Sequence, residues 1–167
     1  MKKISISSLL SLALATFLVF LPSCKKAEKY RDGISCKELS IEIRDEVDNF
    51  GEAMPYSEED IRLIFGSSSL FDDFSVIYSS EPNDINEVGI FHCPDESAAK
   101  KFLAVAKEYV REEEENKKAF VASYAPLEVP KLESAEARRY GNYVIYTILG
   151  EDAKEEAFDK AKEILEK

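Results

Sequence analysis

The stretch that decides the fold is FSVIYSSEPNDINEVGIFHCPDESAAKKFLAVAKEYV, residues 74–110. Residues 74–79 are aromatic and β-branched, residues 81–84 have turn chemistry, and residues 88–93 have the composition of a returning strand. Pro94 and Asp95 then begin a helix whose apolar residues recur at helical spacing. These apolar residues are Ala99, Phe102, Leu103, Ala106, Tyr109 and Val110. The stretch therefore predicts a β-hairpin followed by an amphipathic helix.

A second unit of the same kind closes the chain. Residues 132–140 are expected to be extended, Gly141-Asn142 forms a tight turn, and residues 143–149 return as a strand. The last helix follows, with an apolar stripe of Ala153, Ala157, Phe158, Ala161, Ile164 and Leu165. Placing Val88 on Val144 also places Phe102 on Phe158, although any two hairpin–helix units align crudely. An internal repeat and two unrelated units of one kind both fit this pattern.

Two helices are expected before the first hairpin. Apolar residues recur every three or four positions, which predicts one helix ending at Pro55. They are Leu39, Ile43, Val47, Phe50 and Met54. Ser57 caps a second helix that ends at Gly66. The expected fold class is therefore α+β: two N-terminal helices followed by two ββα units, which form a four-stranded antiparallel sheet with helices packed on one face.

The first 24 residues, MKKISISSLLSLALATFLVFLPSC, indicate export. Two lysines, an apolar run and a small residue at Ser23 make a secretory signal. A cysteine directly after that signal resembles the lipobox of bacterial lipoproteins, in which the cysteine, here Cys24, is diacylated and becomes the mature N-terminus. Two acyl chains give firm anchoring. The alternative is an uncleaved signal anchor, because the apolar run is near the lower limit for spanning a bilayer.

These features predict the organisation of the chain. Residues 1–23 are a lipoprotein signal peptide, residues 24–36 a flexible lipid-anchored tether, and residues 37–167 a single α+β domain. The expected location is the extracytoplasmic face of the cell membrane. Cys24 is committed to lipid, so only Cys36 and Cys93 remain. An exported pair permits a disulfide, but two free thiols are the preferred interpretation.

The composition narrows the functional classes. The formal net charge is −11, from 33 acidic and 22 basic residues. This charge argues against nucleic acid and against electrostatic docking onto anionic lipid. Ten phenylalanines and eight tyrosines supply enough apolar surface for one core, so the chain is not a disordered spacer.

Two stretches resemble a known family. They are residues 87–110 (EVGIFHCPDESAAKKFLAVAKEYV) and residues 124–161, in which Gly141-Asn142-Tyr143-Val144 follows Tyr124-x-Pro126. Both are similar to the DUF4358 lipoproteins, a family of unknown function found mainly in clostridial-type Gram-positive bacteria. The resemblance spans about residues 37 to 166 and implies a small lipid-anchored α+β domain. It assigns no activity and no functional residue.

No catalytic, cofactor or metal site is expected. His92 is the only histidine and adjoins Cys93, but neighbours on a strand point to opposite faces and do not pair. A helix N-terminus beyond Cys93 would lower the pKa of its thiol, whereas the acidic residues at 95 and 96 would raise it. A structural role for His92 is preferred. The chain has no CxxC zinc pattern, calcium loop or glycine-rich phosphate loop.

Three tyrosines of the second hairpin offer a candidate interaction surface: Tyr140, Tyr143 and Tyr146. If one face of the sheet is open, they would suit recognition of a protein or a peptide. If helices cover that face, the same rings belong to the core, and this interpretation is preferred.

The predicted function is a non-catalytic binding module at the membrane, which contacts another envelope protein or a peptide through an open face or an edge of its sheet. Two alternatives come from other classes. One is a cell-envelope enzyme that uses Cys93 with His92. The other is a small-ligand-binding lipoprotein that feeds a transporter, although such proteins usually have two lobes and are longer.

Overall fold

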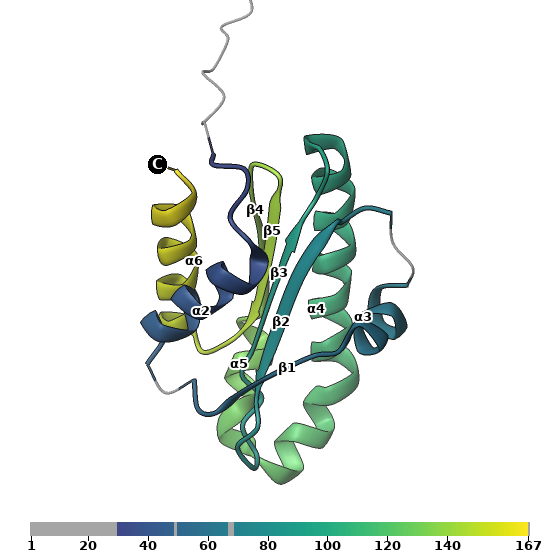
Figure 1. Ribbon diagram of the computed structural model, residues 1–167. Coiled ribbons are helices and arrows are strands. Elements are labelled where there is room, and N and C mark those ends of the chain that lie inside the picture. Colours follow the sequence, from purple (N-terminus) through teal and green to yellow (C-terminus); the bar gives the residue numbers. More distant parts are fainter. Residues whose placement is uncertain (1–29, 49, 67–68, 167) are drawn as a thin grey trace, which may run out of the picture.

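The computed structural model in Figure 1 describes residues 30–48, 50–66 and 69–166. The described part contains one five-stranded antiparallel sheet with the strand order β1-β2-β3-β5-β4. The strands are β1 (Ala53–Pro55), β2 (Asp73–Ser79), β3 (Glu87–His92), β4 (Glu136–Tyr140) and β5 (Tyr143–Ile148). The helices are α2 (Cys36–Glu46), α3 (Glu58–Phe65), α4 (Glu96–Tyr124), the 3-10 turn η1 (Pro126–Glu128), α5 (Val129–Glu133) and α6 (Glu151–Leu165).

Helices cover both faces of the sheet. In Figure 1, α2 and α6 lie on one side, and α3 and α4 lie on the other. Successive residues of β3 enter different clusters: Ile90 packs in the cluster of α2 and α6, and Phe91 packs in the cluster of α4. The prediction that the helices pack on one face is therefore wrong. The physical reason lies in β5, where all six residues are buried, as in a strand covered on both sides.

The predicted first helix is really a helix and a strand. α2 ends at Glu46, Val47 already has an extended backbone, and Gly51 has a φ of 83° that favours glycine. Residues 53–55 then pair with β2 as a fifth strand, which the sequence analysis did not predict. Val47 and Phe50 are buried as expected, because the turn returns them to the same cluster as α2.

The second helix and both hairpins agree with the predictions. Ser57 and Asp60 form a reciprocal capping box at the start of α3, and Asp95 caps α4 through the backbone N–H of Ala98. The tight turn of the second hairpin lies at Gly141-Asn142, between β4 and β5. Only residues 136–140 of the predicted extended segment are a strand, because α5 occupies residues 129–133.

The two hairpin–helix units are not a symmetric repeat. β3 and β5 are adjacent and antiparallel, so a two-fold axis that exchanges them must be perpendicular to the sheet. Rotation about such an axis would place the two following helices on the same face of the sheet. The helix after β3 and the helix after β5 nevertheless lie on opposite faces. The aligned pair Val88 and Val144 accordingly belongs to different clusters.

Residues 30–35, here called the N-terminal strap, are packed against the domain. The N–H of Arg31 donates to the carbonyl of Leu165 at 2.6 Å. The Tyr143 hydroxyl accepts from the N–H of Ile34 at 2.9 Å and donates to the Ile34 carbonyl at 2.7 Å. A Cβ on Gly141 would lie 2.8 Å from the Cβ of Tyr30. Residues 30–35, which fall within the predicted tether of residues 24–36, are therefore in contact with the domain.

The predicted signal peptide and the lipidation residue Cys24 lie outside the described residues. Within residues 30–48, 50–66 and 69–166, no helix is both long and apolar enough to span a bilayer.

Candidate functional site

The three candidate tyrosines do not form an interaction surface. Tyr143 and Tyr146 are fully buried, and Tyr140 is 8% exposed. Tyr140 and Tyr143 pack in the cluster of α2 and α6, whereas Tyr146 packs under α4. The interpretation of an open sheet face is wrong because both faces are covered, and the interpretation of a helix-covered core is confirmed.

Both described cysteines are free and buried, so the preference for two free thiols over a disulfide is confirmed. They lie in different clusters, Cys36 with α2 and Cys93 with α4. Burial, with Asp72 and Asp95 nearby, raises the pKa of Cys93 to about 12. A thiol acts as a nucleophile only as its thiolate. At neutral pH Cys93 is therefore protonated and enclosed, which weighs against the enzyme hypothesis.

His92 clamps the N-terminal strap. Its Nε2 lies 2.6 Å from Oδ1 of Asp32 in the strap, and its Nδ1 lies 2.5 Å from Oδ1 of Asp72. Partial burial lowers the pKa of His92, but the hydrogen bonds and charges of the two carboxylates outweigh it and raise that pKa above its usual value. The preferred structural role of His92 is thus seen, with partners that the sequence did not reveal.

The two edges of the sheet differ sharply. On β4, Arg138 binds Glu136 at 2.8 Å and Glu155 at 2.5 Å, and its guanidinium lies 4.1 Å from the ring centre of Phe158. Such charges block the pairing of a further strand.

On the opposite edge, β1 pairs only with Ile77 to Ser79 of β2. Tyr56 adds one hydrogen bond to the carbonyl of Val76. Residues 73–75 therefore pair with β3 on one side and have no strand on the other side in the described structure.

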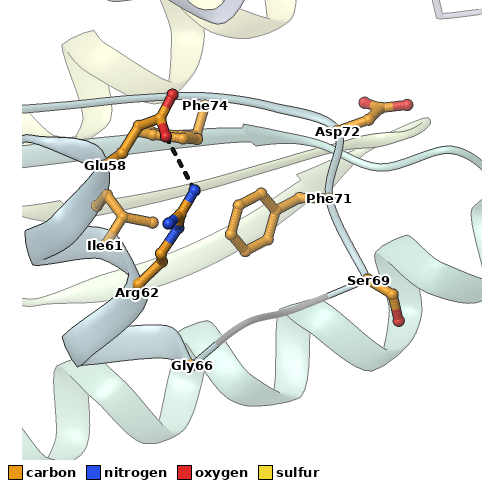
Figure 2. A pocket seen from close by; sticks show the side chains of 8 residues that line it. All are labelled: Glu58, Ile61, Arg62, Gly66, Ser69, Phe71, Asp72 and Phe74. Carbon is orange, nitrogen blue, oxygen red and sulfur yellow. Dashed lines mark hydrogen bonds and ion pairs between the residues drawn. The ribbon is translucent and has the colours of Figure 1, made fainter.

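A groove lies beside this part of β2 (Figure 2). Its volume is about 440 Å³, and its lining residues are Glu58, Ile61, Arg62, Gly66, Ser69, Phe71, Asp72 and Phe74. The ring of Phe71 packs against Phe91 at 5.0 Å and Phe102 at 5.2 Å, which fixes this wall to the core. At the rim, Arg62 and Glu58 form an exposed ion pair, drawn as a dashed line in Figure 2.

The groove suits one large apolar side chain of a bound segment. Aromatic walls supply the apolar contact, and the adjacent edge of β2 supplies main-chain hydrogen-bonding groups. Sequence analysis proposed no site at these residues, which come from α3, from the segment that leads into β2 and from the start of β2. The signal available was the aromatic pair Phe71 and Phe74, which flanks two aspartates.

No group of His, Cys, Asp and Glu side chains in the described ranges is arranged to hold a metal ion. Comparison with curated proteins and with solved structures gave no match.

A comparison with protein families gave one result. The family described as domain of unknown function (DUF4358) matches residues 45–149, which include the groove and all five strands. This match covers more than half of the chain and confirms the resemblance seen in the sequence. The chain belongs to the DUF4358 family.

Proposed function

We propose that this chain is a membrane-anchored extracytoplasmic lipoprotein that binds an extended segment of another envelope protein without catalysis. The anchor is proposed from the sequence pattern of residues 1–24, with Cys24 as the lipidated residue. Five residues separate Cys24 from the strap. A segment of that length reaches about 20 Å at most, so the domain would be held close to the membrane.

The groove beside β2 carries this proposal. Both faces of the sheet are covered and the β4 edge is charged, so in the described residues the start of β2 is an edge segment that could pair with a partner next to the groove. An extended segment would add main-chain hydrogen bonds along residues 73–75 and place one side chain in the groove against Phe71 and Phe74.

The chemistry around the groove describes the partner. Its apolar walls favour a Leu- or Phe-like side chain at the central position. Glu58 and Asp72 line the groove, and the whole chain carries a net charge of −11. Lys or Arg residues that flank the apolar position would complement these carboxylates. The partner is therefore proposed to be a basic, extended segment with one large apolar anchor.

Photo-crosslinking in the native envelope tests the proposal. A photoreactive residue at Ser69, on the groove, should give one adduct in the full-length protein, which mass spectrometry maps to a single extended segment of another protein. Phe74→Ala should abolish the adduct because it removes one wall. Leu63→Ala is the control. Leu63 is 78% exposed on α3, the helix beside the groove, but does not itself line the groove. Adducts only between two copies of the chain, or equal effects of both variants, would overturn the proposal.

A further inference from the structure

The side chain of Glu87 is a buried carboxylate at the first position of β3, with the residue 5% exposed. Its Oε1 accepts hydrogen bonds from the hydroxyls of Tyr109 at 2.8 Å and Tyr146 at 2.7 Å. Its Oε2 accepts from the hydroxyl of Tyr56 at 2.9 Å. The three donors come from α4, β5 and the segment after β1. Since a carboxylate has about four lone-pair sites, Oε2 retains acceptor capacity.

Unlike the acids around it, Glu87 forms no direct ion pair among the described residues, although the charge of Lys117 acts on it from a greater distance and lowers its pKa. Asp84 binds Lys131 at 2.8 Å, and Glu113 forms an ion pair with Lys117. Burial raises the pKa of Glu87, although the three tyrosine hydroxyls act in the opposite direction. Three donors aimed at one carboxyl group favour its ionised form. When Glu87 is ionised, its buried charge is therefore compensated by three hydroxyl dipoles and by the more distant Lys117, with no cation among the described residues in direct contact.

A cavity of about 150 Å³ lies against this carboxylate. Its walls include Tyr56, Tyr78, Glu87, Val121, Leu132 and Ile148. The rings of Tyr56 and Tyr78 lie 4.9 Å apart between centres and form one aromatic wall. The three aliphatic residues lie in one cluster, in which Val121 and Leu132 come from α4 and α5. The cavity thus combines aromatic faces and aliphatic surface with three carboxylates, those of Asp84, Glu87 and Glu113, and with the ammonium group of Lys117. Asp84 and Glu113 already form ion pairs with lysines, and Glu87 forms none among the described residues.

We propose that this cavity binds a small organic cation, an ammonium group on a short aliphatic chain, with Glu87 as its counter-ion. The tyrosine faces would add cation–π attraction, and Val121, Leu132 and Ile148 would contact the alkyl part. The volume corresponds to about five water molecules, which limits the ligand to roughly four to seven non-hydrogen atoms. An anion would be repelled, and a neutral alcohol would leave the buried charge without a counter-ion.

The site goes beyond the proposed binding of an envelope protein and uses none of the residues that line the groove. A purely structural role for Glu87, as a tie between three elements, is the competing explanation. A ligand site and a structural role make different predictions, because only the ligand site requires saturable binding of a cation.

Ligand titration of the full-length protein in detergent micelles distinguishes them. The chain has no tryptophan, and four of its eight tyrosines, Tyr56, Tyr78, Tyr109 and Tyr146, lie at this site, so tyrosine fluorescence is sensitive to binding there. The probe is n-butylammonium chloride, with 1-butanol as the neutral isostere and sodium butyrate as the anion. Butylammonium should bind saturably and about tenfold or more tighter than butanol, and butyrate should not bind.

Variants complete the test. Glu87→Gln keeps an acceptor for the tyrosines but removes the charge, so the affinity for butylammonium should fall about tenfold or more. Glu108→Gln is the matched control on α4, because Glu108 is exposed and does not line the cavity. If Glu87→Gln does not fold, Tyr78→Ala provides a second test that leaves Glu87 intact and should also weaken binding. Equal binding of butanol and butylammonium, no saturable signal, or unchanged affinity in both variants would overturn the proposal.

Discussion

On the face covered by α2 and α6, the central strands contribute Val88, Ile90 and Ile145, all of which are 0% exposed. On the face covered by α3 and α4, the same strands contribute Phe91, Val144 and the buried carboxylate Glu87. Both the groove and the cavity are lined by residues of this second face. The comparison teaches that alternate side chains of one strand can serve different purposes. The face covered by α2 and α6, here called the packing face, holds the domain and its strap together. The face covered by α3 and α4, here called the binding face, carries the candidate binding sites.

The largest effect is expected at Gly89, where the binding face has no room for a side chain. A Cβ there would lie 2.1 Å from Cε1 and 2.4 Å from Cζ of Tyr146. Tyr146 is held by its bond to Glu87, so it cannot move without breaking that network. Gly89→Ala should therefore lower the free energy of unfolding by about 3 kcal/mol. Chemical denaturation measures this, and Gly150→Ala, which meets no atom within 4 Å, should cost about 1 kcal/mol or less.

Two tyrosine-to-phenylalanine variants compare the faces directly. Tyr146→Phe removes a hydrogen bond to a buried carboxylate and should cost about 1.5–3 kcal/mol. Tyr143→Phe removes the neutral bonds to Ile34 in the strap and should cost about 0.5–1.5 kcal/mol. Only Tyr143→Phe should speed hydrogen exchange of the Ile34 amide. If both variants expose that amide equally, the separation between the faces does not hold.

The packing face contains one buried hydroxyl group whose hydrogen bonds are not satisfied in the described residues. The hydroxyl of Thr147 is the one buried side-chain polar atom in the described residues that has no hydrogen-bond partner. Thr147 pairs with Val88, whose side chain lies in the cluster of α2 and α6. Thr147→Val should raise the free energy of unfolding by about 1 kcal/mol, since it removes an unsatisfied group at constant shape. A decrease in stability in the same denaturation assay would show that the hydroxyl has a partner.

A smaller and pH-dependent effect is expected where the strap meets the packing face. The pKa of His92 is raised in the fold, so its stabilising contribution is complete below the ordinary pKa of about 6.5 and is lost as pH rises through the folded pKa. The groups that face the ring are Asp32, Asp72 and the Tyr143 ring, whose centre is 4.8 Å away. Because His92 is the only histidine, one NMR titration gives its pKa. Asp32→Asn should lower that pKa, and an unchanged value would contradict the clamp.

The sequence predicts the hairpins and the last helix because their signals are local. Gly141-Asn142 marks a turn by itself, and the stripe of α6 repeats over four turns. The periodicity of apolar residues does not reveal the break between α2 and β1, because Val47 and Phe50 keep helical spacing after the helix has ended. The covering of both faces had a signal in β5, whose sequence YVIYTI lacks the regular polar alternation of a strand with one exposed face.

The candidate sites depend on contacts between distant residues. Glu87 resembles any charged residue at the start of a strand, and its partners Tyr56, Tyr109 and Tyr146 are scattered along the chain. The clamp joins Asp32 to His92 across 60 positions. Periodicity and motifs describe near neighbours, so neither arrangement was predictable without the fold.

The most direct test of the central claim places the same photoreactive residue on each face of the full-length protein in the cells that produce it. One position is Ser69, on the groove, and the other is Glu42, exposed on α2. We expect the residue at position 69 to capture one extended segment of another envelope protein and the residue at position 42 to capture none. Capture of the same segment with equal yield from both positions would contradict the assignment of binding to the face of α3 and α4.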